Sequence, residues 1–392
     1  MQRAHKIELK PTCGQERYFR KACGTARFVY NWALAAWNSQ YEAGGKPSGL
    51  DLKKQFNEIK YQEFPWIAEI HRDAHSQPFQ NLQRGFSAFF RGTAKRPVFK
   101  RKGQKDSFYV ANDKFRVDGR RIHLPVLGWV KMTEALRFQG KRQGAVVSRV
   151  ADRWYVSISM DAELPETTPG TGSVGVDLGI KASITLSTGQ VFRSPKPLKK
   201  QLRKLRRVQR QHSRKAKGSR NRVRSAKRIA KIHWRIANIH KDFLHKATTI
   251  ILRENKAVVI EDLLVAGMVR NRKLARHVSE EAFGEMRRQL EYKAAAFGAV
   301  IHVVNRWFPS SKTCSNCGQV KPALKLSQRM FECDACGLVL DRDLNAARNL
   351  VQQLPAASRE VMPVDCPESG ASAPVGGTKQ ELCRAHRCAQ ER

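Results

Sequence analysis

The chain has 392 residues, and 73 lysines and arginines against 34 aspartates and glutamates give it a formal charge of +39 and a pI near 10.4. Such an excess of one sign repels itself unless a polyanion neutralises it, so nucleic acid is the expected partner, although composition alone leaves a ribosomal or packaging protein open. No run approaches ~20 apolar residues, which argues against a membrane span, and the start lacks an apolar signal-peptide core, so we expect a cytoplasmic protein.

The N-terminal segment begins with a strand and continues into helices. Residues 5–10 alternate polar and apolar side chains, which predicts a strand. A helix is expected from Gln15, because apolar side chains recur there at steps of three and four. We assign this face to the core; it consists of Phe19, Cys23, Ala26, Tyr30, Ala33 and Trp37. Helical stretches at 52–61 and 79–90 extend the helical segment over residues 15–91.

A basic stretch and a group of strands follow. Residues 91–105 hold seven lysines or arginines and no acid, a composition that suits phosphate contact but also a solvated loop. The side chains expected to contact phosphate are Lys100, Arg101 and Lys102. Residues 107–161 have the pattern of strands, with a hairpin turn at 151–153. The Pro-, Thr- and Gly-rich stretch 164–172 predicts a linker.

A second unit, from residue 173, is a series of short strands with helices between them. Its first strand carries Asp177, and a later strand ends in Glu261 and Asp262. An amphipathic helix is expected over 279–297, with acids in its first turn where they suit the helix dipole. The strands are expected at 174–180, 183–186, 190–192, 256–262 and 299–304.

A cationic stretch lies between the third and fourth of these strands. From Lys196 to Arg235 the sequence has eighteen lysines or arginines, and no acid follows Asp177 until Asp242. The apolar spacing predicts a helical hairpin with a seam of Leu198, Leu202 and Leu205 against Val223, Ala226, Ala230, Trp234, Ala237 and Leu244. So much unrelieved charge favours nucleic-acid contact over a solvated face. The expected contacts are Arg203, Arg206, Arg207, Arg210, Arg220, Arg224 and Arg228.

Four cysteines near the C-terminus have the spacing of a zinc ribbon. Two C-x2-C pairs are separated by fifteen residues, and two knuckles joined by such a loop can close a tetrahedral four-thiolate site. The expected zinc ligands are Cys314, Cys317, Cys333 and Cys336. This use of cysteine fits a reducing compartment. Hydrophobic periodicity then ends, so we expect a disordered tail over 354–392 with free thiols at Cys366, Cys383 and Cys388.

Three acids have the order expected of a metal-dependent nuclease. A lone carboxylate at the end of a strand that is covered on both faces is costly unless it is paired or binds metal. The order of strands and helices is that of a ribonuclease-H-like layer, which would bring Asp177, Glu261 and Asp343 together. Three such carboxylates can hold two Mg2+ ions that activate water and stabilise the leaving oxygen of a phosphodiester. Asp341 competes with Asp343 for the third position, and Asp262 with Glu261.

These residues resemble the TnpB (OrfB) proteins of bacterial insertion sequences, RNA-guided nucleases related to the type V CRISPR effectors. The resemblance is carried by Val176-Asp177-Leu-Gly-Ile, Ile260-Glu261-Asp-Leu, Ser310-Ser-Lys-Thr-Cys314-Ser-Asn-Cys317-Gly and Asp341-Arg-Asp343-Leu-Asn-Ala-Ala-Arg-Asn. The helix around Asn31-Trp32 and the stretch Phe99-Lys-Arg-Lys102-Gly are also similar to that family's N-terminal half. The resemblance covers residues 1–352 and is most specific in the last third.

The resemblance implies an α+β multidomain architecture. It implies a wedge-like β-barrel of residues 1–14 and 92–165, interrupted by a helical recognition module of residues 15–91. A RuvC-like nuclease domain of residues 173–309 and 338–353 would follow, with a zinc ribbon inserted at 310–337.

The resemblance further implies a magnesium-dependent DNA endonuclease with Asp177, Glu261 and Asp343 as its catalytic acids. Its partners would be a guide RNA from the transposon's right end and target DNA, double- and single-stranded, cut next to a short transposon-associated motif. Such a bacterial protein would lie with the nucleoid when bound to DNA. Two other functions stay open: a transposase with a ribonuclease-H core that needs no RNA, and a non-catalytic nucleic-acid-binding regulator.

Overall fold

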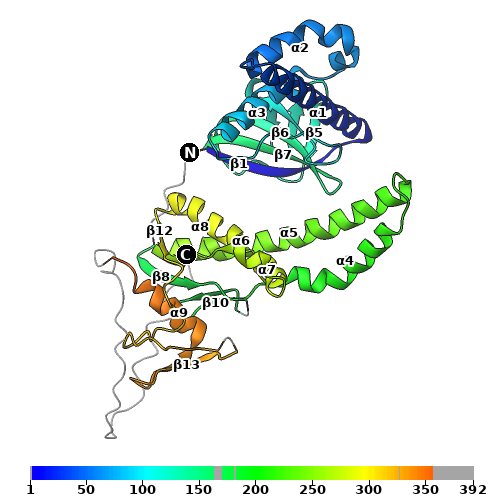
Figure 1. The fold of residues 1–392 in the computed structure, drawn as a ribbon. Helices are drawn as coiled ribbons and strands as arrows, with labels where there is room; N and C mark the ends of the chain where they lie inside the picture. The colour runs from blue at the N-terminus through cyan, green and yellow to red at the C-terminus, as the bar shows by residue number, and fades with distance from the viewer. Residues whose placement is uncertain (1, 163–169, 181, 326, 356–392) are drawn as a thin grey trace, which may run out of the picture.

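The computed structural model describes residues 2–162, 170–180, 182–325 and 327–355. Figure 1 shows two bodies, an N-terminal unit in blue to cyan and a second unit in green to orange. Most of the predicted linker, and the predicted tail beyond Pro355 with its three cysteines, lie outside the described residues. Among the described helices, none is long and apolar enough to cross a membrane.

The N-terminal unit is built on a seven-stranded antiparallel sheet with the order β2-β6-β7-β1-β5-β4-β3. Its strands are β1 (Gln2–Lys10), β2 (Ser107–Ala111), β3 (Arg116–Asp118), β4 (Arg121–Leu124), β5 (Gly128–Met132), β6 (Gly140–Val150) and β7 (Arg153–Ala162). The predicted hairpin joins β6 to β7, and the turn residues Ala151 and Asp152 both have positive φ, as a tight two-residue hairpin requires.

The sheet is curled but not closed. β2 and β3 form its two edges, yet only a single-turn 3-10 helix, Asn112–Lys114, separates them along the chain, so the edges must approach each other. One core fills the concave side and includes side chains from strands across the sheet. Among the described residues no ladder joins β2 to β3, so the predicted closed barrel is not confirmed.

Helices pack on this sheet and on one another: α1 (Cys13–Glu42), α2 (Gly49–Glu63), the 3-10 helix Pro65–Glu69 and α3 (Arg72–Phe90). Thr12 begins α1 with a capping box, because its hydroxyl accepts from the Gln15 N–H and the Gln15 side chain accepts from the Thr12 N–H. The predicted apolar face of α1 is buried. Its first half, with Phe19, packs in the sheet core, whereas its second half, with Trp37, packs against α2 and α3.

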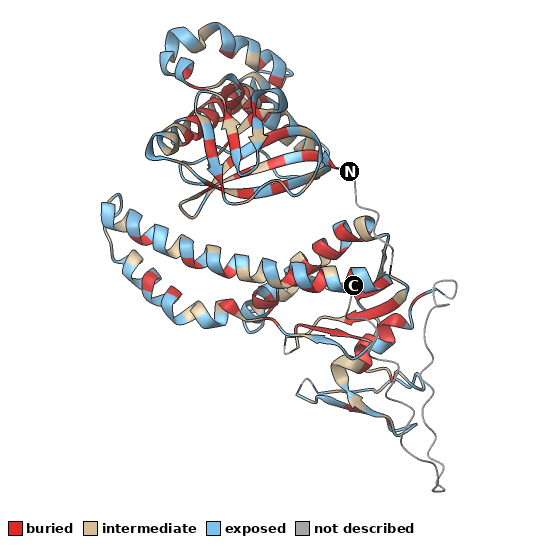
Figure 2. Cartoon of the chain, turned by 180° about the vertical axis from the view of Figure 1, so that it is seen from behind, coloured by how far each residue is buried: buried red, intermediate tan, exposed pale blue. Residues whose placement is uncertain are grey.

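The second unit is built on a five-stranded sheet with the order β10-β9-β8-β11-β12. Its strands are β8 (Gly172–Asp177), β9 (Ile184–Leu186), β10 (Val191–Phe192), β11 (Asn255–Glu261) and β12 (Val300–Val304). β8, β11 and β12 are parallel to one another, whereas β9 pairs antiparallel with β8, and β10 pairs antiparallel with β9. The first and fourth strands are therefore parallel neighbours, as the ribonuclease-H-like order predicts. Most residues of both strands are buried (Figure 2).

Helices cover both faces of this sheet. One core contains residues of β8, β11, α5 (Arg220–Glu254) and α8 (Phe283–Phe297), and a second lies between β11 and α9 (Arg342–Val351). α9 also lies directly on β8: a Cβ atom on Gly175 would come 2.0 Å from the carbonyl oxygen of Ala347. Gly175 thus allows the close approach that brings the start of α9 to the end of β8.

The cationic stretch forms a helical hairpin of α4 (Pro197–Ser213) and α5, but its seam differs from the prediction. Leu205 packs as expected, with Val208, Ile232 and Ile236, whereas Val223 is 52% exposed. On α5 the predicted seam, with its valine and alanines, and the observed seam, with Ile232 and Ile236, both have helical spacing. Spacing alone therefore could not show which side of α5 faces α4. The isoleucines face the seam because they bury more apolar area than alanines do.

The helix predicted over 279–297 is two helices, α7 (Ala275–Glu281) and α8, which follow the short α6 (Val265–Arg270). Ala282 breaks the helix with a φ of +53°. Glu280 therefore does not begin a helix of its own; its carboxylate accepts the N–H groups of Leu198 and Lys199 and caps α4 instead. Glu280 therefore does interact with the N-terminus of a helix, as predicted for these acids, but the helix is α4 and not the one that follows it in the sequence.

Candidate active site and metal centre

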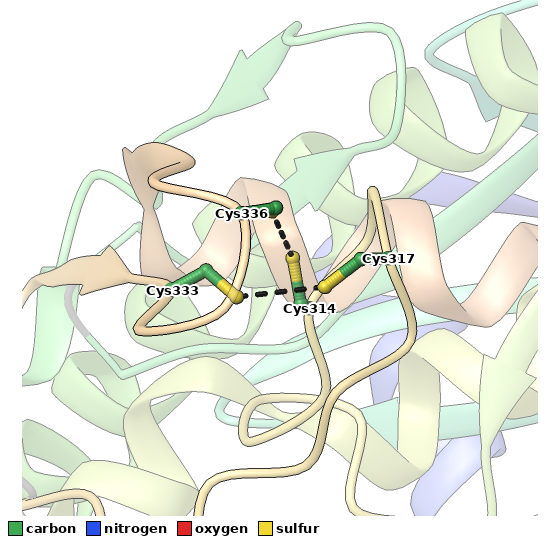
Figure 3. Close-up of side chains that lie close together, drawn as sticks. All are labelled: Cys314, Cys317, Cys333 and Cys336. Atoms are coloured by element: carbon green, nitrogen blue, oxygen red, sulfur yellow. Dashed lines mark hydrogen bonds between the residues drawn. The ribbon is translucent and has the colours of Figure 1, made fainter.

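The four predicted zinc ligands converge at one point (Figure 3). All four sulfur atoms lie within 4.8 Å of one another, with Cys314 Sγ 3.6 Å from Cys336 Sγ and Cys317 Sγ 3.5 Å from Cys333 Sγ. A tetrahedral zinc ion with Zn–S bonds of ~2.3 Å holds its sulfurs roughly 3.8 Å apart. None of the four is in a disulfide, so this donor set fits a zinc ion.

Each cysteine pair is held in a turn of the same kind. The backbone N–H groups of Cys314 and Cys333 each donate at 2.8 Å to the carbonyl of the residue five positions later. A glycine follows each pair with positive φ, Gly318 at +77° and Gly337 at +70°. A hydrogen bond from the Asn316 side chain is the main reason that the pKa of Cys336 falls to about 6, which favours the metal-binding thiolate.

The first cysteine-bearing loop is fixed to α9 and its C-cap by side-chain amides that the sequence analysis missed. Asn345 donates to the carbonyl of Thr313 at 2.7 Å and accepts the N–H of Ser315 at 2.9 Å. Asn349 also donates to the Thr313 carbonyl, at 2.6 Å, and Gln352 donates to the Ser315 carbonyl at 2.7 Å. Asn345, Asn349 and Gln352 are four and three residues apart, so they lie on one side of α9 and its C-cap. That spacing is the feature of the sequence that could have predicted a shared contact surface.

The three acids lie near one another at the carboxyl edge of the parallel strands. Val176 of β8 pairs with Ile260 of β11, so Asp177 and Glu261 leave neighbouring strands at the same level. Asp343 lies in the first turn of α9. A Cβ atom on Gly179 would lie 3.6 Å from Asp343 Oδ2 and 3.9 Å from Asp177 Oδ2, which places both carboxylates around the loop that follows β8.

The electrostatics of this cluster favour a bound cation. Burial of the carboxyl, followed by the charges of Glu261 and Asp343, raises the pKa of Asp177 to about 8. Arg329 is the cation that pairs with this cluster at its edge, with its Nη1 atom 4.0 Å from Asp343 Oδ1. Divalent cations bound by the three carboxylates would replace the proton and offset the repulsion. These oxygens are the hard ligands that Mg2+ prefers.

The two competing acids are engaged elsewhere. Asp262 pairs with Arg287 at 2.6 Å and with Arg306. The carboxylate of Asp341 caps α9 by accepting the N–H of Asp343 at 2.9 Å and that of Leu344 at 3.1 Å. Asp262 and Asp341 already have these partners, so Glu261 and Asp343 are the better candidates to bind a metal together with Asp177.

The raised pKa of Asp177 predicts a pH-dependent stability. In the folded protein without added magnesium this pKa is about 8, against 3.8 for the free group, so the folded state holds a proton that the unfolded state releases. Stability from this group is complete below pH 4 and is lost as pH rises to 8. We expect Asp177→Asn to melt progressively higher than wild type from pH 5 to 8, by a few degrees. The measurement is the melting temperature of both proteins as a function of pH. A constant difference across this range would show that the pKa of Asp177 is not raised, and added Mg2+ should make the difference smaller.

The predicted arginines of the hairpin are available for nucleic acid. All seven are exposed, and none forms an ion pair within the part of the chain described. Arg207 and Arg228 also line a cleft of about 990 Å3 between the hairpin and the N-terminal sheet. The other cations that the hairpin contributes to this cleft are Lys204, Lys231 and Arg235.

In the basic segment before β2, one of the three predicted phosphate contacts is also attached to the protein. Lys100, Arg101 and Lys102 are all exposed. The ammonium of Lys100, however, lies 3.8 Å from the centre of the Tyr30 ring, and its partial desolvation there lowers its pKa. The backbone of Lys100 exchanges two hydrogen bonds with the Asn31 side chain, so this residue is attached to α1.

Direct contacts across the cleft were also missed by the sequence analysis. The indole N–H of Trp234 on α5 donates to the Tyr155 hydroxyl on β7 at 2.8 Å. The guanidinium of Arg153 lies 4.5 Å from the Trp234 ring centre. Lys227 pairs with Asp152 at 3.3 Å. These contacts join α5 to the N-terminal sheet at one side of the cleft. The paired residues are more than seventy positions apart in the sequence, so no spacing pattern could have linked them.

Three family models match parts of this chain. The OrfB family of IS605 elements, described as "Probable transposase", matches residues 155–272, and the Cas12f1-like TNB domain matches residues 283–350. A model described as a helix-turn-helix domain matches residues 1–46. In the structure that last range contains strand β1 and the single long helix α1.

Similar proteins extend over nearly the whole chain. A protein of Streptomyces pristinaespiralis, provisionally named an RNA-guided DNA endonuclease, is 37% identical over 373 residues, which cover 91% of this chain and 90% of the relative. InsQ of Escherichia coli K12, with the same provisional name, is 35% identical over 371 residues, or 89% and 91% of the two chains. The Cas12f1–sgRNA–target DNA complex matches with a TM-score of 0.56 and 15% identity over 86% of this chain and 83% of that one, a likeness of fold alone.

Proposed function

Because the chain belongs to the TnpB (OrfB) family, we propose that it is an RNA-guided DNA endonuclease of a bacterial insertion sequence. The relatives that cover nine-tenths of the chain carry that name provisionally. The observation that carries the proposal is the convergence of Asp177, Glu261 and Asp343 at the carboxyl edge of a ribonuclease-H-like sheet. A non-catalytic binding protein gains nothing from three half-buried acids that repel one another.

In the proposed reaction, Asp177, Glu261 and Asp343 hold the catalytic metal. Bound magnesium, in two ions, would supply an activated water and charge stabilisation at the phosphodiester. The three carboxylates would fix where the scissile phosphate binds, because they would hold the ions that contact it. The zinc ribbon acts structurally, since its four cysteines fill a tetrahedral site and leave no position for substrate.

Sequence choice in this proposal belongs to a guide RNA made from the transposon's right end. Base pairing with the guide selects the DNA, and the protein holds the nucleic-acid backbone and reads only a short transposon-associated motif. The cationic hairpin and the cleft beside it are suited to backbone contact, because exposed arginines without acidic partners are free to bind phosphate.

Neutralising two cleft arginines should weaken RNA binding and its salt dependence. In Arg207→Gln/Arg228→Gln, we expect the slope of log K against log salt to fall by about 2, since each phosphate contact contributes about 1. Binding isotherms at several salt concentrations measure this slope. The charge-matched control is Lys21→Gln/Lys246→Gln, because both lysines are exposed and already paired with acids. Equal losses in the two variants would mean that the cleft is not the interface.

The function is tested by purifying the protein after co-expression with its native flanking DNA and sequencing the nucleic acid that it retains. A discrete RNA that ends in variable sequence would support a guided nuclease. Heterogeneous RNA, or none, would contradict it. Strand transfer of transposon ends without RNA would instead favour the transposase that the OrfB description names.

A further inference from the structure

A hydroxyl from the ribbon reaches the carboxylate cluster. Ser310 Oγ donates to Glu261 Oε1 across 49 residues of sequence. Ser310 is 6% exposed and lies four residues before the first zinc ligand, Cys314. Glu261 Oε2 has no protein hydrogen bond within the described ranges, so one oxygen is held by protein and the other is left for a ligand.

Ser310 is itself held from a second direction. The side-chain amide of Asn349, which is 1% exposed, donates to the Ser310 carbonyl at 2.7 Å. The same amide donates to the Thr313 carbonyl at 2.6 Å, next to Cys314. Asn349 and Asp343 are on the same helix, α9, so one rigid element positions Asp343 directly and Glu261 through Ser310.

We infer that Ser310 is a positioning residue for Glu261: Asn349 holds the Ser310 backbone in place, and the Ser310 hydroxyl orients the Glu261 carboxylate toward the metal that the acids would bind. This inference rests on the proposed function. A glutamate side chain at a strand end has several rotamers, and selecting one before metal binds removes an ordering cost. Hydrogen-bond partners of metal ligands typically contribute 10- to 100-fold in affinity.

The test is calorimetric titration of Mn2+ into the full-length protein, which needs no cleavage. Ser310→Ala is expected to weaken the Asp177-dependent Mn2+ site roughly tenfold while the zinc content stays unchanged. Ser310→Thr, which keeps the hydroxyl, should bind Mn2+ nearly as wild type does. Ser311→Ala is the matched control, because the neighbouring serine has no side-chain hydrogen bond in the described structure. Asp177→Ala identifies which binding heat belongs to the site.

The outcomes separate this inference from the function on which it rests. Equal Mn2+ affinity in Ser310→Ala and wild type would overturn the inference, as would an equal loss in Ser311→Ala. If Ser310→Ala fails to fold, Ser310→Cys keeps the side-chain shape with a weak donor and should show the same loss. A wild-type protein whose Mn2+ site depends on Ser310, but which cuts no guided target, would overturn the proposed function and leave the positioning role supported.

Discussion

Replacing Asp177 by alanine is expected to abolish DNA cleavage and leave RNA binding intact. Burial and neighbouring acids raise the pKa of Asp177 to about 8, and the variant would remove a proposed metal ligand that the other two carboxylates cannot replace. Metal-assisted stabilisation of a phosphodiester transition state is worth several kcal/mol, which corresponds to a roughly thousandfold or larger loss of rate. Single-turnover cleavage by the purified RNA complex measures this loss, and RNA retention is measured on the same sample.

Asp262→Asn is the matched control for this variant. Asp262 lies next to Glu261, but its carboxylate is occupied by Arg287 and Arg306. Its loss should cost some stability, and the cleavage rate should stay within a few fold of wild type. A wild-type rate in Asp177→Ala, or an equal loss in Asp262→Asn, would show that the catalytic acids are assigned wrongly.

Replacing Cys317 by serine is expected to remove zinc and, with it, cleavage. A four-cysteine site that loses one thiolate no longer satisfies tetrahedral zinc, and structural zinc contributes directly to the free energy of folding. The ribbon is joined to α9 through Asn345, Asn349 and Gln352, so its collapse should also displace Asp343. Elemental analysis should fall from one zinc per chain to none, with a lower melting temperature.

Cys13→Ser provides the control for loss of a thiol. Cys13 is exposed at the start of α1, far along the chain from the ribbon, and forms no disulfide. Zinc content and melting temperature should match those of wild type. An undisturbed fold with a full zinc content in Cys317→Ser would contradict the assignment of Cys317 as a ligand.

The arrangement of the second unit could be predicted because its constraints are local. The order of strands and helices along the chain is that of a ribonuclease-H-like layer, in which the first and fourth strands are neighbours, and β8 and β11 are neighbours in the structure. Asp177 and Glu261 stand at the ends of those strands, so their convergence needs no knowledge of side-chain packing. The cysteine spacing is equally direct, since a C-x2-C turn followed by glycine is a complete local unit.

The remaining features depend on contacts between distant residues. Trp234 and Tyr155 meet only because the hairpin crosses the N-terminal sheet. The α5 seam was misplaced because alanines and isoleucines shared the helical period. Glu280 was assigned to the helix beside it in sequence, although the donors it satisfies belong to α4. Closure of a sheet is likewise decided by strand tilt and register, which composition does not encode.

The central claim is that a bound RNA directs Mg2+-dependent cleavage by this chain. The most direct measurement replaces the variable end of the co-purified RNA with a chosen sequence and offers the complex two DNAs, one matched and one scrambled, with the same flanking motif. We predict that the matched DNA alone is cut, and that a second guide sequence moves the cut to its own target. Cleavage that ignores the guide, or a complex with a discrete RNA that cuts neither DNA, would contradict the account.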